Sequence, residues 1–168
     1  MQVFPIFQAS SIFLDTTNIT HTRLRCITKQ KKSNLSETEQ IINMVEKFFE
    51  IGKTKNLVLL REIQLDDPNF SSFSDVPPYE LQDYSTTLIL EELRFVSISD
   101  YDYEITNPKI SIFGGCAVVA LELMQKGMIV DNKAYTGEHI VIHGRGTFVL
   151  IKKPTWKIVH MHLSKINN

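Results

Sequence analysis

The spacing of apolar residues changes near residue 100, and this change constrains the fold more than any other feature of the chain. Before it, apolar side chains recur every three or four residues, as in amphipathic helices. After it, they alternate with polar ones or form short apolar runs, as in strands. The order predicts three helices followed by long antiparallel strands, with no alternation of strand and helix. We therefore expect an α+β fold with the helices on one side of the sheet.

Local signals place the ends of these elements. Ser36 and Glu39 fit a capping box that opens the first helix, and Gly52 is expected to close it. Gly114-Gly115 predicts a hairpin turn, and Pro108 predicts a bulge or an edge position. We expect helices over residues 36–52, 57–65 and from about 78, strands over 101–112, 116–124, 134–151 and 156–164, and loops at 69–79 and 126–132.

The first 34 residues differ from the rest of the chain. Threonines interrupt any helical pattern there, and a basic stretch follows them. We interpret residues 1–34 as a poorly ordered or loosely docked extension, and residues 35–168 as the folded domain. A nucleic-acid or membrane arm is the alternative to a solvated tail.

Composition excludes several classes of function. The 168 residues carry a formal net charge of -1, which gives no drive toward nucleic acid or acidic lipid. No stretch reaches the roughly 20 apolar residues that span a bilayer. The apolar residues 1–14 lack the positive start of a signal peptide. The two cysteines, Cys26 and Cys116, form no disulfide framework, so we expect a cytoplasmic protein without nucleic-acid or membrane partners.

The closing segments carry a family resemblance. Arg145-Gly146-Thr147-Phe148 and then Trp156-x-x-Val159-His160-x-His162-x-Ser164 resemble the last hairpin of SnoaL-like proteins, and are similar to the association (hub) domain of calcium/calmodulin-dependent protein kinase II. Residues 70–79 resemble the Phe-Ser-x-Phe-x-Asp-x-Pro-Pro loop of such proteins. The resemblance covers about residues 36–166. It implies a cystatin-like (nuclear-transport-factor-2-like) cone, in which a curved antiparallel sheet wraps around the N-terminal helices and encloses a pocket, and a homodimer formed through the convex sheet face.

Strand alternation indicates which side chains face that pocket. In the last strand, Val159, Met161 and Leu163 share one parity and are assigned to the concave face. The arginines of hub pockets correspond here to Leu121, Phe148 and Leu163, so the resemblance implies an apolar pocket for a small hydrophobic molecule. The predicted ligand-binding residues are Phe49, Phe70, Phe73, Tyr79, Tyr84, Leu121, Phe148, Met161 and Leu163.

Catalysis in the same cavity is a second hypothesis. Ketosteroid isomerases resemble this fold, and burial in such a cavity raises carboxyl pKa values. Asp75, Glu138, Tyr79 and Tyr84 are weak candidates for an isomerase, dehydratase or cyclase. None matches an isomerase motif: Asp75 is expected to cap a loop or helix, and Glu138 to lie near an exposed strand end.

His143, His160 and His162 are weak candidates for metal ligands. Alternate residues of a strand point the same way, but no third and fourth ligand is fixed by spacing, so we expect neither metal nor cofactor.

The sequence leaves three hypotheses for function. We favour a homodimeric module that binds a small apolar ligand. The alternatives are an enzyme that uses the same cavity and a hub-like oligomerisation module.

Overall fold

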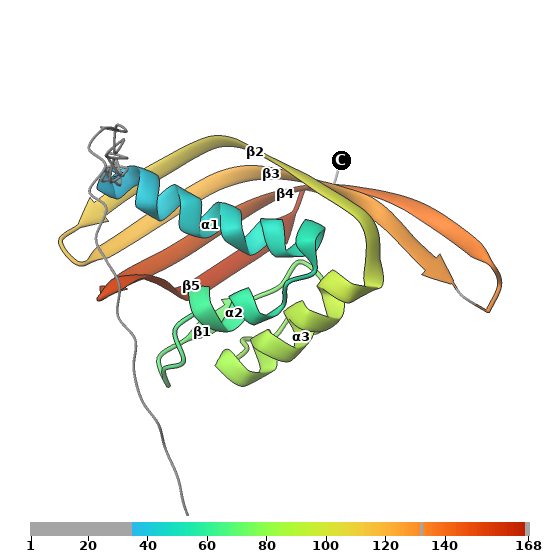
Figure 1. The fold of residues 1–168 in the computed structure, drawn as a ribbon, viewed down its shortest axis with the longest axis horizontal. Helices are drawn as coiled ribbons and strands as arrows, with labels where there is room; N and C mark the ends of the chain where they lie inside the picture. Colours follow the sequence, from blue (N-terminus) through green and yellow to red (C-terminus); the bar gives the residue numbers. More distant parts are fainter. Residues whose placement is uncertain (1–34, 132, 167–168) are drawn as a thin grey trace, which may run out of the picture. The chain divides into compact units, whose positions relative to one another are not determined.

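The computed structural model describes residues 35–131 and 133–166, which form three helices and five strands (Figure 1). The extension predicted over residues 1–34 lies outside the described residues. The elements are, in chain order, α1 (Glu37–Thr54), α2 (Val58–Ile63), β1 (Ser71–Phe73), α3 (Tyr84–Ser97), β2 (Ile98–Phe113), β3 (Cys116–Asp131), β4 (Thr136–Lys153) and β5 (Thr155–Lys165).

The strands form one curved sheet in the order β1-β5-β4-β3-β2 (Figure 1). The four long strands pair antiparallel along the chain, as predicted. The short β1 was expected to be part of a loop, but it pairs parallel with β5, from Ser71 opposite His160 to Phe73 opposite His162. The helices lie against one face of the sheet, which confirms the α+β class.

The first helix begins as predicted and ends later. The Ser36 hydroxyl accepts a hydrogen bond from the Glu39 amide at 3.2 Å, and the Glu39 carboxylate accepts one from the Ser36 amide at 2.7 Å. Gly52 does not close the helix. It lies inside α1, where a Cβ would collide with the ring of Tyr101. The helix ends instead at Lys55, which adopts the left-handed conformation.

The third helix begins six residues later than expected from its apolar spacing. Asp83 is its N-cap and accepts a hydrogen bond from the Thr86 amide at 2.8 Å. The preceding residues are extended, because Gln82 exchanges two backbone hydrogen bonds with Ser72. Leu81, which falls within the helix expected from about residue 78, therefore lies in the extended segment and is 62% exposed.

The β2–β3–β4 meander is longer than its sequence pattern indicates. Residues 126–131, expected to be a loop, continue β3, whose pairing with β4 is unbroken from Cys116 to Asp131. The prediction for Pro108 is confirmed: β2 is an edge strand, and its pairing with β3 shifts between Thr106 and Lys109.

A bulge in β5 changes which side chains face inward. Phe148 and Val149 pair with Met161 and His160, but Leu150 pairs with Ile158, so Val159 is the extra residue. Met161 is buried on the concave side, as predicted. Val159 was predicted inward and is only half-buried, whereas Ile158 is fully buried. The alternation rule failed there because the bulge reverses the parity of the strand.

Four phenylalanine rings join the helices to the sheet. Phe48 contacts the rings of Phe49, Phe95 and Phe148 at centroid distances of 5.1, 5.5 and 5.8 Å, all edge-to-face. All four side chains are at most 1% exposed. Such contacts add roughly 0.5–1.5 kcal/mol each to the hydrophobic stabilisation of the core.

The bulge can be tested by truncating its two neighbouring residues. We expect Ile158→Ala to lower the free energy of unfolding by about 2–4 kcal/mol, because it opens a cavity in the core. Val159→Ala should cost about 1 kcal/mol or less. Urea unfolding of both variants measures the difference, and an equal or reversed order would contradict the bulge.

Candidate functional site

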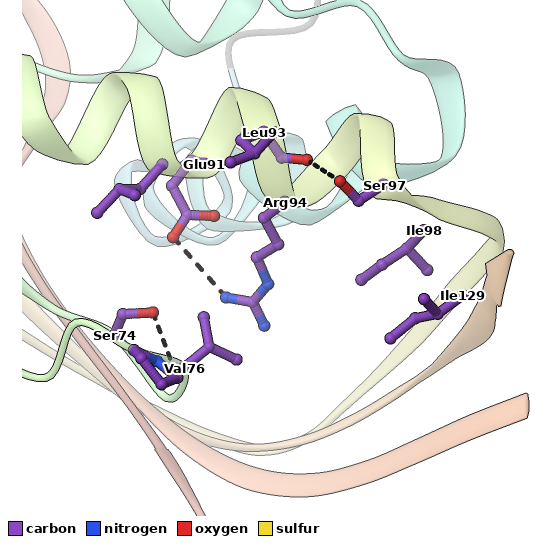
Figure 2. A pocket seen from close by; sticks show the side chains of 10 residues that line it. Ser74, Val76, Glu91, Leu93, Arg94, Ser97, Ile98 and Ile129 are labelled. Atoms are coloured by element: carbon purple, nitrogen blue, oxygen red, sulfur yellow. Dashed lines mark hydrogen bonds and ion pairs between the residues drawn. The ribbon is translucent and has the colours of Figure 1, made fainter. Parts of the chain in front are cut away.

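Arg94 is a buried cation held between two segments that are distant in sequence. Its side chain is 8% exposed and points from α3 toward the loop that follows β1 (Figure 2). The guanidinium Nη1 lies 3.0 Å from Oδ1 of Asp75, and Nη2 donates to Oδ2 at 3.3 Å. The Asp75 side chain is 3% exposed, so this ion pair lies almost entirely out of water.

Two further groups complete the surroundings of Arg94. The amide oxygen of Gln125 on β3 accepts hydrogen bonds from Nη2 of Arg94 at 3.1 Å and from the hydroxyl of Tyr101 at 2.8 Å. Burial raises the pKa of Tyr101, so its hydroxyl keeps its proton and donates. Arg94 thus links α3, the 74–77 loop and the sheet.

Glu91 is a second carboxyl in this cluster. It lies one turn before Arg94 on α3, is 3% exposed, and has its Oε1 3.7 Å from Nη1 of Arg94. Its Oε2 has no hydrogen-bond partner among the residues that the structure describes. Burial raises the pKa of Glu91; Arg94 opposes this shift, and the charge of Asp75 adds to it.

A cavity of about 230 Å³ lies beside this cluster (Figure 2). We call it the α3 cavity. Figure 2 shows Arg94 extending into the space between α3 and the loop, with Val76 on one side and Ile98 and Ile129 on the other. The lining residues are Ser74, Val76, Pro77, Leu90, Glu91, Leu93, Arg94, Ser97, Ile98 and Ile129. Its walls are therefore largely apolar, and its two ionisable groups, Glu91 and Arg94, are buried ones.

The nine residues predicted to bind a ligand lie elsewhere, and most belong to the core. Phe49 and Phe148 are fully buried with their rings 5.8 Å apart, and Phe70 packs edge-to-face on the half-buried Tyr84. Leu121 and Leu163 both pair with Gly146 across the sheet, where the missing side chain leaves room for them. Met161 is likewise buried.

A second hollow, of about 410 Å³, brings several predicted residues together beside β1 and the 74–77 loop. Phe73, Asp75, Tyr79, His162 and Leu163 line it together with Ser74, Ser164 and Lys165. Tyr79 is 65% exposed there. Asp75 therefore borders this hollow while it pairs with Arg94, which borders the α3 cavity.

The remaining catalytic candidate, Glu138, belongs neither to the Arg94 cluster nor to the lining of either hollow. Glu138 lies on β4 opposite Ile129 and is exposed, near the end of the β3–β4 hairpin. It shares the concave parity with Phe148, because β4 has no bulge against β3 between them. Asp75 was expected to cap a loop or helix; it forms the buried ion pair with Arg94, and the N-cap of α3 is Asp83.

The three histidines do not form one group. His160 accepts from or donates to the Ser71 hydroxyl at 2.8 Å, and its pKa is lowered by partial burial and by the neighbouring His162. His162 pairs with Thr147, four residues from His143 on β4, which is roughly 13 Å along a strand. Within residues 35–131 and 133–166, no three His, Cys, Asp or Glu side chains are placed to hold a metal ion.

Asp75 was a sequence candidate, but the other residues of the buried cluster were not, although the sequence carries a signal for two of them. Glu91 falls at helical spacing between the apolar residues Leu88 and Phe95, so a charged group lies on the buried face of a helix. Gln125 shares strand parity with Leu121 and Leu123. Charged or amide groups on a buried face need partners, and this makes them candidates for a site.

A SnoaL-like domain model matches residues 41–167. The chain belongs to the SnoaL-like family. No curated protein matches the chain in sequence. Family membership agrees with the resemblance found in the closing hairpin.

Solved structures share the fold at low sequence identity. A Streptomyces avermitilis protein, named as a candidate dehydratase of the NTF2-like family, is 17% identical over 78% of this chain and 97% of its own, with a TM-score of 0.68. An NTF2-like superfamily protein from Salmonella enterica is 18% identical over 77% and 91%, with a TM-score of 0.64. The association domain of CaMKII from C. elegans is 18% identical over 76% and 94%, with a TM-score of 0.59. These likenesses establish the NTF2-like, cystatin-like fold of this SnoaL-like domain.

The protonation of Glu91 can be tested through stability. Above the pKa of a glutamate in the unfolded chain, about 4.3, the unfolded state releases a proton that the folded state keeps. The free energy of unfolding of the wild type, relative to Glu91→Gln, should therefore fall as the pH rises from 5 toward the raised folded pKa, by up to about 1.4 kcal/mol per unit.

Urea unfolding between pH 5 and 8 measures this difference. Glu80→Gln, at an exposed carboxyl, serves as the control and should follow the wild type. A difference between wild type and Glu91→Gln that is constant with pH would show that Glu91 is ionised in the folded domain.

Proposed function

We propose that this SnoaL-like domain binds a small, mostly apolar molecule in the α3 cavity. The observation that carries the proposal is the pairing of apolar walls with a few buried polar groups. Small-molecule sites have this composition, since the walls supply affinity and the polar groups fix orientation. The cavity also lies beside Arg94, which links α3, the 74–77 loop and the sheet.

The size of the cavity limits the ligand. At about 230 Å³ it exceeds the ~150 Å³ of a cavity that holds benzene, and it falls below the ~300 Å³ at which drug-sized sites begin. A molecule with one substituted ring fits these bounds, whereas a four-ring steroid would not be enclosed. Ligand binding by the nine residues predicted from the sequence, and a cytoplasmic location, stay predictions.

Toluene is a suitable probe, since it is uncharged and has a single ring. We expect it to shift the amide signals of residues 97, 98 and 129 in ¹H–¹⁵N NMR titrations. Ile129→Trp should abolish these shifts, because Ile129 lines the cavity and the larger side chain fills it. Val130→Trp is the matched control: the two residues are adjacent, 46% and 42% exposed, and Val130 does not line the cavity.

Toluene shifts that are absent in the wild type, or that persist unchanged in Ile129→Trp, would contradict ligand binding in this cavity. Native mass spectrometry of the purified protein would then be used to identify a natural ligand by its mass.

An enzyme of the isomerase, dehydratase or cyclase type is a second candidate function. The buried carboxyl of Glu91 favours it, because a protonated acid in an apolar site can transfer its proton to a substrate. Glu91 is, however, the only carboxyl that lines the α3 cavity in the described part of the chain. Acid–base chemistry in most such sites also needs a base, so we place binding first.

We propose that the domain forms a homodimer through the convex sheet face. The helices cover the concave face, and no described helix covers the other (Figure 1). Apolar and uncharged side chains meet there, including Val118 and Ala120 on β3 and Thr147 and Val149 on β4. The structural likeness to the CaMKII association domain supports oligomerisation through such a domain.

A charge in the centre of this face should separate the protomers. We expect Ala120→Arg to reduce the mass measured by light scattering from two chains to one, since an arginine would be buried without a partner. Thr136→Arg, exposed at the start of β4, is the control and should stay dimeric. A wild-type monomer would refute the dimer, and a mass above two chains would favour the hub-like alternative.

Among the described residues, no helix combines the length and the apolar character that crossing a bilayer requires.

A further inference from the structure

We propose that the α3 cavity selects small uncharged molecules that carry a carbonyl group, and that this carbonyl accepts a hydrogen bond from the carboxyl of Glu91. The inference rests on the proposed ligand-binding function and deepens it by naming the chemical class of the ligand. Three observations carry it: the charge balance of the buried cluster, the unpartnered oxygen of Glu91, and the apolar walls around it.

The charge balance of the cluster places a proton on Glu91. The guanidinium of Arg94 engages Asp75 with both terminal nitrogens, at 3.0 and 3.3 Å, whereas Glu91 is 3.7 Å away. One cation therefore neutralises one carboxylate. A second buried carboxylate would be a charge without a close partner, which is costly in a site out of water, so Glu91 keeps a proton instead.

The unpartnered oxygen makes Glu91 available to a ligand. Oε2 is buried and has no hydrogen-bond partner among the residues that the structure describes. Figure 2 shows the carboxyl projecting from α3 toward the space between the helix and the 74–77 loop, and Glu91 lines the cavity there. A buried donor without an acceptor is unfavourable, so a ligand that supplies the acceptor gains affinity.

The other polar groups exclude a ligand with a negative charge. Nη2 of Arg94 donates to Asp75 and to Gln125, and Nη1 lies 3.0 Å from Oδ1 of Asp75. Nη1 has no hydrogen-bond partner among the described residues, but the charge of the cation is already balanced by Asp75. An anion would also approach Asp75 and Glu91. The apolar residues Val76, Ile98 and Ile129 suit an aliphatic or aromatic ring. A ring with a ketone, aldehyde or ester carbonyl matches both the walls and the donor.

Two probes of nearly the same shape test this preference. Acetophenone carries a carbonyl, and α-methylstyrene replaces its oxygen by a methylene group that accepts no hydrogen bond. We expect acetophenone to bind about tenfold more tightly in ¹H–¹⁵N NMR titrations at pH 6, which is the size of one added hydrogen bond.

Two substitutions separate the hydrogen bond from the fold. Glu91→Gln keeps a donor and should keep the preference for acetophenone. Glu91→Leu removes the donor and should bind both probes equally, while the charges of Arg94 and Asp75 stay balanced. A preference for acetophenone that persists in Glu91→Leu would overturn the hydrogen bond, and the pH dependence supplies an independent measurement.

The preference of the wild type should disappear as the pH rises and Glu91 loses its proton, and that of Glu91→Gln should not. The charged and titratable groups that face Glu91 are Asp75 from the loop, Arg94 from α3 and Tyr101 from β2. The pKa values of Arg94 and Tyr101 are both raised, so the first keeps its charge and the second its proton. The glutamine variant, which has no titratable group at this position, assigns the pH dependence to Glu91 if its own preference stays constant.

The outcomes distinguish this inference from the proposed function. Equal binding of the two probes, with toluene binding intact, would overturn the carbonyl preference and leave ligand binding in place. Tighter binding of benzylamine than of acetophenone would show an ionised Glu91 and also overturn it. Failure of all these probes to bind would contradict the proposed function, and with it the inference.

Discussion

The burial of Arg94 organises the part of the domain that we assign to function. A guanidinium out of water must be paired, and Asp75, Gln125 and Glu91 surround it from three different segments. Removing one partner of such a pair typically costs about 3–5 kcal/mol, because the other charge is left buried. The cluster therefore fixes the loop and α3 against the sheet, and the cavity between them keeps its walls.

A second contact fixes the same, C-terminal end of α3. The ammonium of Lys55, at the C-cap of α1, donates to the backbone oxygens of Phe95 and Ile98, each at 2.6 Å. These are the carbonyls at a helix end that lack partners within the helix. Lys55 thus ties the ends of α1 and α3 together beside the start of β2. Partial burial lowers its pKa, which agrees with its place among carbonyls rather than in open water.

The packing on the concave face explains why the cavity lies near the C-terminal end of α3 and not over the middle of the sheet. Long apolar side chains from neighbouring strands meet over Gly146, and the aromatic residues of α1 fill the remaining space. A pocket in the middle of the sheet would need smaller or polar side chains at these positions. The space that persists is near the C-terminal end of α3, where β3 extends past the helices and Ile129 forms a wall.

The sequence by itself determined the class of the fold, the capping box of α1, the β2–β3 turn, the bulge at Pro108 and the family. These follow from signals confined to a few residues or to one repeating period. The β5 bulge, the strand β1 and the start of α3 were decided by pairing across the sheet, which depends on residues far apart in the chain. The buried cluster was likewise decided only by tertiary structure. The sequence shows Glu91 and Arg94 as an unusual pair of charges on a helix. Their partners, Asp75 and Gln125, lie 19 and 31 residues from Arg94, and they meet it only because the sheet curves under α3.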